Sequence, residues 1–86
     1  MLTSKALEAL SETDAGRRLP DGGGLFGTAR AAADGRVTVA FTYRYRFAGK
    51  HRDLRRGSWP ATPLQQIRNA RDNAKALVAE GPDPAP

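Results

Sequence analysis

The chain has 86 residues, of which 40% are hydrophobic and 27% charged, the balance of one small globular domain. It contains no cysteine, which excludes disulfides, thiolate metal sites and cysteine nucleophiles and favours a reducing, cytoplasmic location. No apolar run approaches the roughly 18 residues that a membrane-spanning helix needs, so we expect no membrane partner.

The charge is positive and unevenly distributed. Fourteen basic residues against nine acidic ones give a net charge of +5. Seven of the cations lie between Arg36 and Arg56, where the single carboxylate is Asp53. Most of the cations are arginines, whose planar guanidinium suits bidentate contacts with phosphate and guanine. The composition therefore favours a polyanionic partner.

The first quarter of the chain predicts little regular structure. Thr3 or Ser4 can cap a short helix that carries Leu7 and Leu10 at helical spacing. We interpret residues 11–20 as a polar connection, and the Asp-Gly-Gly-Gly sequence after it as a chain-breaking turn.

Two strands follow. Residues 25–31 predict a weak strand because they include a glycine and two alanines. Asp34-Gly35 predicts a hairpin leading into a strand over residues 36–47. This strand alternates strictly, so one face is apolar and aromatic and the other carries small and cationic side chains. The apolar row is Val37, Val39, Phe41, Tyr43, Tyr45 and Phe47.

Ala48-Gly49 turns the chain into a third strand over residues 50–56. A two-residue turn places Asp53 opposite Arg44, whereas a bulged turn exchanges the faces of the third strand. Alanine is a poor occupant of a turn position with positive φ, so both registers stay open. With the two-residue turn, the cationic face carries Thr42, Arg44, Arg46, His51 and Arg55.

A long helix closes the domain. Thr62 and Pro63 mark its start, and apolar residues recur from Leu64 to Val78 at three- and four-residue spacing, Leu77 among them. Gly81-Pro82 predicts its end. The prediction is an α+β domain over residues 1–81: a short helix, a three-stranded antiparallel sheet, and a long helix on one sheet face. Residues 82–86 then begin a linker.

Four motifs occur in a characteristic order: DGGGLF at 21–26, FTYRYRFAGK at 41–50, GSWP at 57–60 and EGPDP at 80–84. Together they resemble the N-terminal arm-type DNA-binding domain of phage and genomic-island integrases, which are tyrosine recombinases. Ala48 departs from that pattern, which usually has asparagine in the turn. Arg56 also departs, because an apolar residue is common at its position.

The resemblance implies that the outer face of a three-stranded sheet enters the DNA major groove at arm-type sites. Its expected partners are double-stranded DNA and the catalytic recombinase domains of a longer protein. The domain itself is expected to perform no chemistry, to need no cofactor or metal, and to have no small-molecule substrate. The implied DNA contacts are Arg44 and Arg46, with Thr42, Lys50, His51, Arg52 and Arg55 as neighbours.

Other interpretations use the same basic sheet. It could bind RNA or an acidic protein instead of DNA. Tyr43 and Tyr45 could stack on bases, but they share the face of Val37 and Val39, which favours a place in the core. The single histidine, His51, cannot form a metal site alone, and the acidic residues show no spacing that suggests acid–base catalysis. Trp59 is expected to pack at the start of the long helix.

Overall fold

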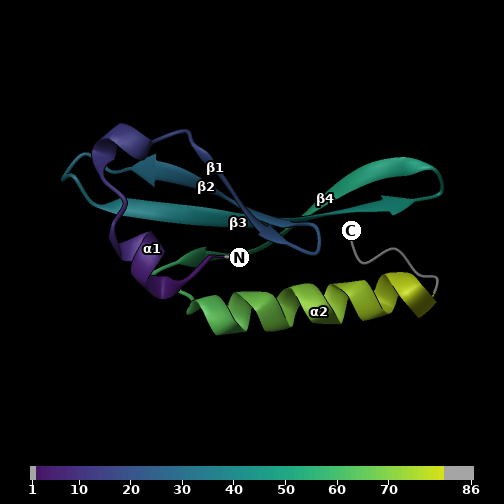
Figure 1. Cartoon of the computed structure of the whole chain (residues 1–86). Helices are drawn as coiled ribbons and strands as arrows, with labels where there is room; N and C mark the ends of the chain where they lie inside the picture. The colour runs from purple at the N-terminus through teal and green to yellow at the C-terminus, as the bar shows by residue number, and fades with distance from the viewer. Residues whose placement is uncertain (1, 81–86) are drawn as a thin grey trace.

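An antiparallel sheet backed by one long helix forms the domain in the computed structural model, which describes residues 2–80 (Figure 1). The strands follow one another in the order β1-β2-β3-β4. In Figure 1, α2 runs below the sheet along its length, so the other face of the sheet stays open. The elements are α1 (Ser4–Glu8), a 3₁₀ turn η1 (Glu12–Asp14), β1 (Arg18–Gly22), β2 (Leu25–Ala31), β3 (Val37–Phe47), β4 (Lys50–Trp59) and α2 (Leu64–Glu80).

The sheet has four strands, so the prediction of three is wrong. The additional strand, β1, lies in the stretch interpreted as a polar connection and a turn. It is only five residues long and includes Pro20, which a strand at the sheet edge tolerates. Leu19 and Asp21 are buried while their neighbours are exposed. A buried aspartate breaks the apolar alternation by which a strand is identified in a sequence.

Glycines allow the β1–β2 hairpin to lie against β3. Gly24 has φ +86°, and a Cβ there would lie 2.6 Å from the carbonyl oxygen of Arg44. The backbone N–H of Arg44 in turn donates to the Gly24 carbonyl at 2.8 Å. Within β2, a Cβ on Gly27 would lie 2.4 Å from Cγ1 of Val39. The glycine that weakens the strand signal is therefore required by close packing on the inner face.

The β3–β4 hairpin has the register expected of a two-residue turn. Arg46 pairs with His51, and Arg44 pairs with Asp53. Ala48 takes a positive φ of 52° at the turn, despite the unfavourable contacts of its Cβ. A bulge near Arg56 then shifts the pairing, and the Arg56 guanidinium donates to the backbone carbonyl of Ala70 on α2 at 3.4 Å. An arginine is thus accommodated on the helix side of the strand.

The tyrosine row is part of the core, as predicted. Tyr43 and Tyr45 are 6% and 5% exposed, and their rings stack with centroids 5.4 Å apart. They pack with Ala74 of α2 in a cluster that Phe47, Leu54 and Val78 flank. A second cluster, around Leu7, Leu25, Phe41, Leu64 and Ile67, fills the other end of the sheet–helix interface.

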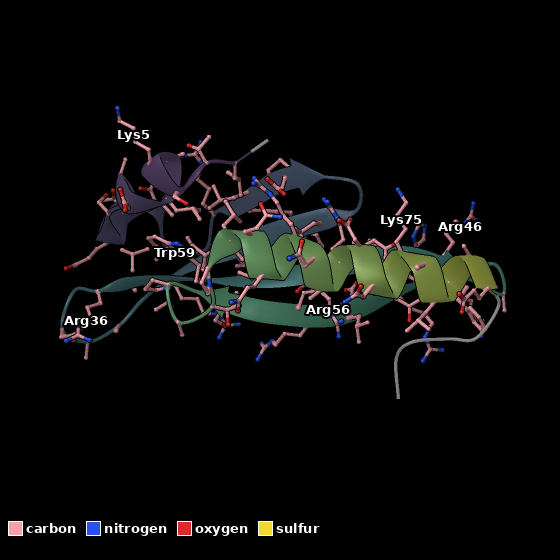
Figure 2. The ribbon with its side chains drawn as sticks, turned by 90° about the horizontal axis from the view of Figure 1, so that it is seen from below. Lys5, Arg36, Arg46, Arg56, Trp59 and Lys75 are labelled. Carbon is pink, nitrogen blue, oxygen red and sulfur yellow. The ribbon has the colours of Figure 1, made fainter. Side chains whose placement is uncertain are left out.

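The start of α1 follows the predicted cap. Thr3 caps α1, since its Oγ1 accepts from the Ala6 N–H at 3.1 Å. Helix α2 begins at Leu64, and Trp59 lies beside that start, partly buried against the core (Figure 2). Leu77 is 43% exposed, so its assignment to the apolar stripe is wrong. The predicted helix end at Gly81 and the linker lie outside the described residues. Neither helix in residues 2–80 is long and apolar enough to cross a membrane.

Replacing Ala48 by asparagine should stabilise the domain. Asparagine adopts positive φ at lower cost than alanine, so we expect a gain of roughly 0.5–1 kcal/mol in the free energy of unfolding. Urea denaturation would measure it. Ala33→Asn, an exposed change in the other hairpin loop where φ is not positive, is the control and should produce a smaller gain. Equal effects of the two changes would contradict strain at Ala48.

Candidate nucleic-acid interface

The sheet face turned away from α2, here called the outer face, carries five arginines and the histidine. Alternation along each strand and the pairing between strands place them there together. They come from all four strands: Arg18, Arg30, Arg44, Arg46, His51 and Arg55. Asp53 is the one carboxylate among the strand residues of this face. Arg18 and Arg30 escaped the sequence-based prediction because the first belongs to the strand that was missed and the second to a weak one.

The structure divides the seven predicted contact residues into two groups. Thr42, Arg44, Arg46, His51 and Arg55 share the outer face. Lys50 and Arg52 do not, because they pair with Phe47 and Tyr45, whose side chains point to the helix side. Lys50 nevertheless adjoins the turn at the exposed tip of the hairpin.

Arg44 is held in place by Asp53 on the neighbouring strand. Its Nε donates to Oδ1 at 2.9 Å and its Nη2 donates to Oδ2 at 3.3 Å. Both side chains remain accessible, 43% and 48% exposed. The hydrogen bond from Arg44 holds the pKa of Asp53 below its ordinary value, and the same contact raises the pKa of Arg44. By contrast, the guanidinium of Arg46 makes no ion pair within residues 2–80.

An aromatic ring lies among these cations. The guanidinium carbon of Arg18 sits 4.5 Å from the centroid of Phe26, and that of Arg44 sits 5.4 Å from it. Stacking on a ring restricts a guanidinium while leaving its N–H groups accessible. Beside Phe26, a shallow depression of about 460 Å³ is lined by Pro20, Arg46 and His51 among others. The outer face thus combines apolar contact surface with hydrogen-bond donors.

A buried carboxylate anchors the edge of this face. Asp21, 3% exposed, accepts hydrogen bonds from Arg68 of α2 at 2.9 and 3.1 Å and from the Leu2 N–H at 2.7 Å. Arg68 also donates to the Leu2 carbonyl. Arg71 lies 3.9 Å from the carboxylate and donates to the Gly22 carbonyl at 3.2 Å. The glycine-rich motif is therefore tied to the helix by its aspartate.

Asp21→Asn should be severely destabilising. Removing one partner from a buried ion pair leaves Arg68 uncompensated, which typically costs about 3–5 kcal/mol. Denaturant unfolding at neutral pH would measure the loss. Asp72→Asn is a matched control, because it removes a carboxylate that is 61% exposed, and it should change stability by only about 0.5 kcal/mol. Similar losses in the two variants would contradict the anchoring role.

The same pair predicts a pH dependence of stability. Burial raises the pKa of Asp21, but the hydrogen bonds from Arg68 and Leu2 outweigh it, so the net shift is downward. The carboxyl group of Asp21 therefore binds a proton more readily in the unfolded chain, where its pKa is about 3.9. The stabilisation that the ionised Asp21 gives to the fold is complete above that pH. It is lost as the pH falls through the lower pKa of Asp21 in the folded state. The unfolding free energy should thus drop below about pH 4, and less steeply in Asp21→Asn.

The described residues form a small α+β domain: an open antiparallel sheet with a basic outer face and a long helix behind it. The comparison with known families is specific: residues 2–86 match the model of the arm DNA-binding domain. The chain belongs to this family, and it is a DNA-binding domain.

A curated relative agrees with the family. The chain is 34% identical over 83 residues to the integrase of Enterobacteria phage P4. The alignment covers 96% of this chain but only 18% of that protein. The chain thus spans less than a fifth of the relative's length.

Proposed function

We propose that the outer face binds duplex DNA in the major groove and reads its sequence, as the arm-site module of a longer integrase of the tyrosine recombinase type. The observation that carries the proposal is the collection of five arginines on the sheet face that α2 leaves open. Membership of the arm DNA-binding family supports the choice of DNA as the polyanion.

The shape of the sheet suits the groove. The major groove of B-form DNA is about 12 Å wide and admits a two-stranded β-ribbon. The β3–β4 hairpin is such a ribbon, with strands of 11 and 10 residues. Figure 1 shows its turn extending past the β1–β2 hairpin. The ribbon can therefore enter the groove while the shorter strands face the phosphate backbone.

The roles of the side chains follow from their positions. Arg44 and Arg46, on β3, would meet base edges, where guanine offers two acceptors to an arginine. Arg18, Arg30 and Arg55 lie on flanking strands and would contact phosphates. Contacts with the DNA backbone would be added by Lys50 and His51 near the turn and by Thr42 in the middle of the ribbon. Arg52 lies on the helix side of β4, so it would contact a phosphate at the edge of the groove and no base.

RNA binding by the same face is the second candidate, and the form of the duplex separates the two. The major groove of A-form RNA is deep and narrow and would exclude the ribbon. We expect the 86-residue chain to prefer B-form DNA over an RNA duplex of the same sequence in a competition assay. Equal binding of both duplexes would contradict entry into the major groove.

Salt dependence tests the phosphate contacts. If the outer arginines neutralise phosphates, log K should fall linearly with log salt, by about 0.9 for each phosphate contacted. Fluorescence anisotropy at several salt concentrations would measure the slope. We expect Arg30→Ala to reduce the slope by about one such unit. A slope near zero would favour an acidic protein partner over DNA.

Arg46→Ala should lower affinity for a duplex selected from a random-sequence pool by about 1–3 kcal/mol and relax the base preference. Lys50→Ala should weaken selected and random duplexes nearly alike. Lys75→Ala is the control for charge alone, because Lys75 extends from α2 into solvent (Figure 2). It should have little effect on either duplex. Equal, sequence-independent losses in Arg46→Ala and Lys50→Ala would remove the assignment of base contacts to β3.

A further inference from the structure

We infer that Asp53 is a positioning residue for sequence recognition: it fixes the guanidinium of Arg44 so that its free edge faces a guanine. The inference rests on the proposed binding of DNA by the outer face. Asp53 itself need not touch DNA, because it acts through Arg44.

The atoms that Asp53 engages decide which donors remain. An arginine has five N–H donors, on Nε, Nη1 and Nη2. Asp53 accepts from Nε at 2.9 Å and from Nη2 at 3.3 Å. Both N–H groups of Nη1 and the second one of Nη2 are left, and these lie at the end of the side chain. That pair of nitrogens matches the O6 and N7 acceptors of guanine.

A second contact restrains the same group. The Phe26 ring lies 5.4 Å from the guanidinium carbon, on the β2 side, while Asp53 holds it from the β4 side. Arg44 is therefore fixed between two neighbours before DNA arrives. A side chain that is already ordered loses less conformational entropy on binding, and it tolerates a misplaced base poorly.

Charge argues that Asp53 serves selectivity rather than affinity. A carboxylate amid arginines on a DNA-binding face repels phosphate and lowers the affinity for every sequence. The fold gains little in return, because both partners are about half exposed and exposed ion pairs add little to stability. A group that weakens general binding while orienting one donor raises the ratio of specific to non-specific affinity.

The test compares Asp53→Asn and Asp53→Ala with the unchanged chain. Each protein is titrated with a duplex selected by the unchanged chain from a random pool, and with an unselected random-sequence duplex. Both variants should bind the random duplex as tightly as the unchanged chain or more tightly. Their ratio of specific to random affinity should fall about fivefold or more, the lower end of what one arginine–guanine pair provides.

Glu80→Gln is the matched control for charge. Glu80 is exposed at the end of α2, on the other side of the sheet, and its replacement removes the same negative charge. It should shift both affinities in the same direction and leave their ratio unchanged. A fall in the ratio as large as that in Asp53→Asn would overturn the inference. Thermal unfolding of each variant confirms that the fold is retained.

A double-mutant cycle separates positioning from a direct contact. If Asp53 acts through Arg44, then Asp53→Asn should not lower the ratio further in an Arg44→Ala background. Guanines replaced by 7-deazaguanine, which lacks the N7 acceptor, give an independent readout. The unchanged chain should lose affinity at one such position, and Asp53→Asn should lose less there.

The outcomes distinguish this inference from the proposed function. If the unchanged chain selects no sequence, the proposed base readout fails and the role of Asp53 fails with it. If the unchanged chain is selective and Asp53→Asn keeps the full ratio, DNA recognition stands and the inference is wrong. An undiminished effect of Asp53→Asn in the Arg44→Ala background would also overturn it.

Discussion

Successive side chains of a strand point to opposite faces of a sheet, and the rest of this domain depends on how β3 uses that constraint. The aromatic row faces α2 and is buried, while the arginines between its members face away. Because α2 covers only the aromatic side, the arginines of the cationic side remain exposed. A shift of one residue in register would bury arginines and expose tyrosines.

The parts of the fold that local pattern determines could be predicted from the sequence. The alternation over residues 36–47 identified β3, and helical spacing with a cap identified both helices. The register of the β3–β4 hairpin follows from a two-residue turn. The sequence offered this turn as one of two alternatives but could not decide between them, because alanine at position 48 disfavours the positive φ that the turn requires. Pairing along the whole hairpin, including the packed tyrosines, stabilises the turn and outweighs the local cost at that one residue.

The parts that depend on distant residues could not be predicted. Strand β1 has a polar sequence, and its buried aspartate is stabilised by Arg68, 47 residues further along the chain. Nothing near Asp21 signals this contact. Missing the strand also meant missing Arg18, and with it the stack on Phe26. The predicted contact residues therefore cover β3 and its hairpin, and they omit the outer-face arginines on β1 and β2. Lys50 and Arg52 were included for their charge, although strand parity separates them from the outer arginines.

Two aspartate–arginine pairs occupy opposite sides of the sheet, and burial gives them different consequences. Asp21 is enclosed, so Arg68 must neutralise it, and the pair ties β1 to α2. Asp53 is solvated and could be replaced without leaving a buried charge. The same chemical pair therefore contributes rigidity to the scaffold in one place and orientation of a single side chain in the other. A small domain with a single long helix has few ways to hold a long arginine side chain in one orientation. Pairing it across the sheet achieves this without enlarging the core.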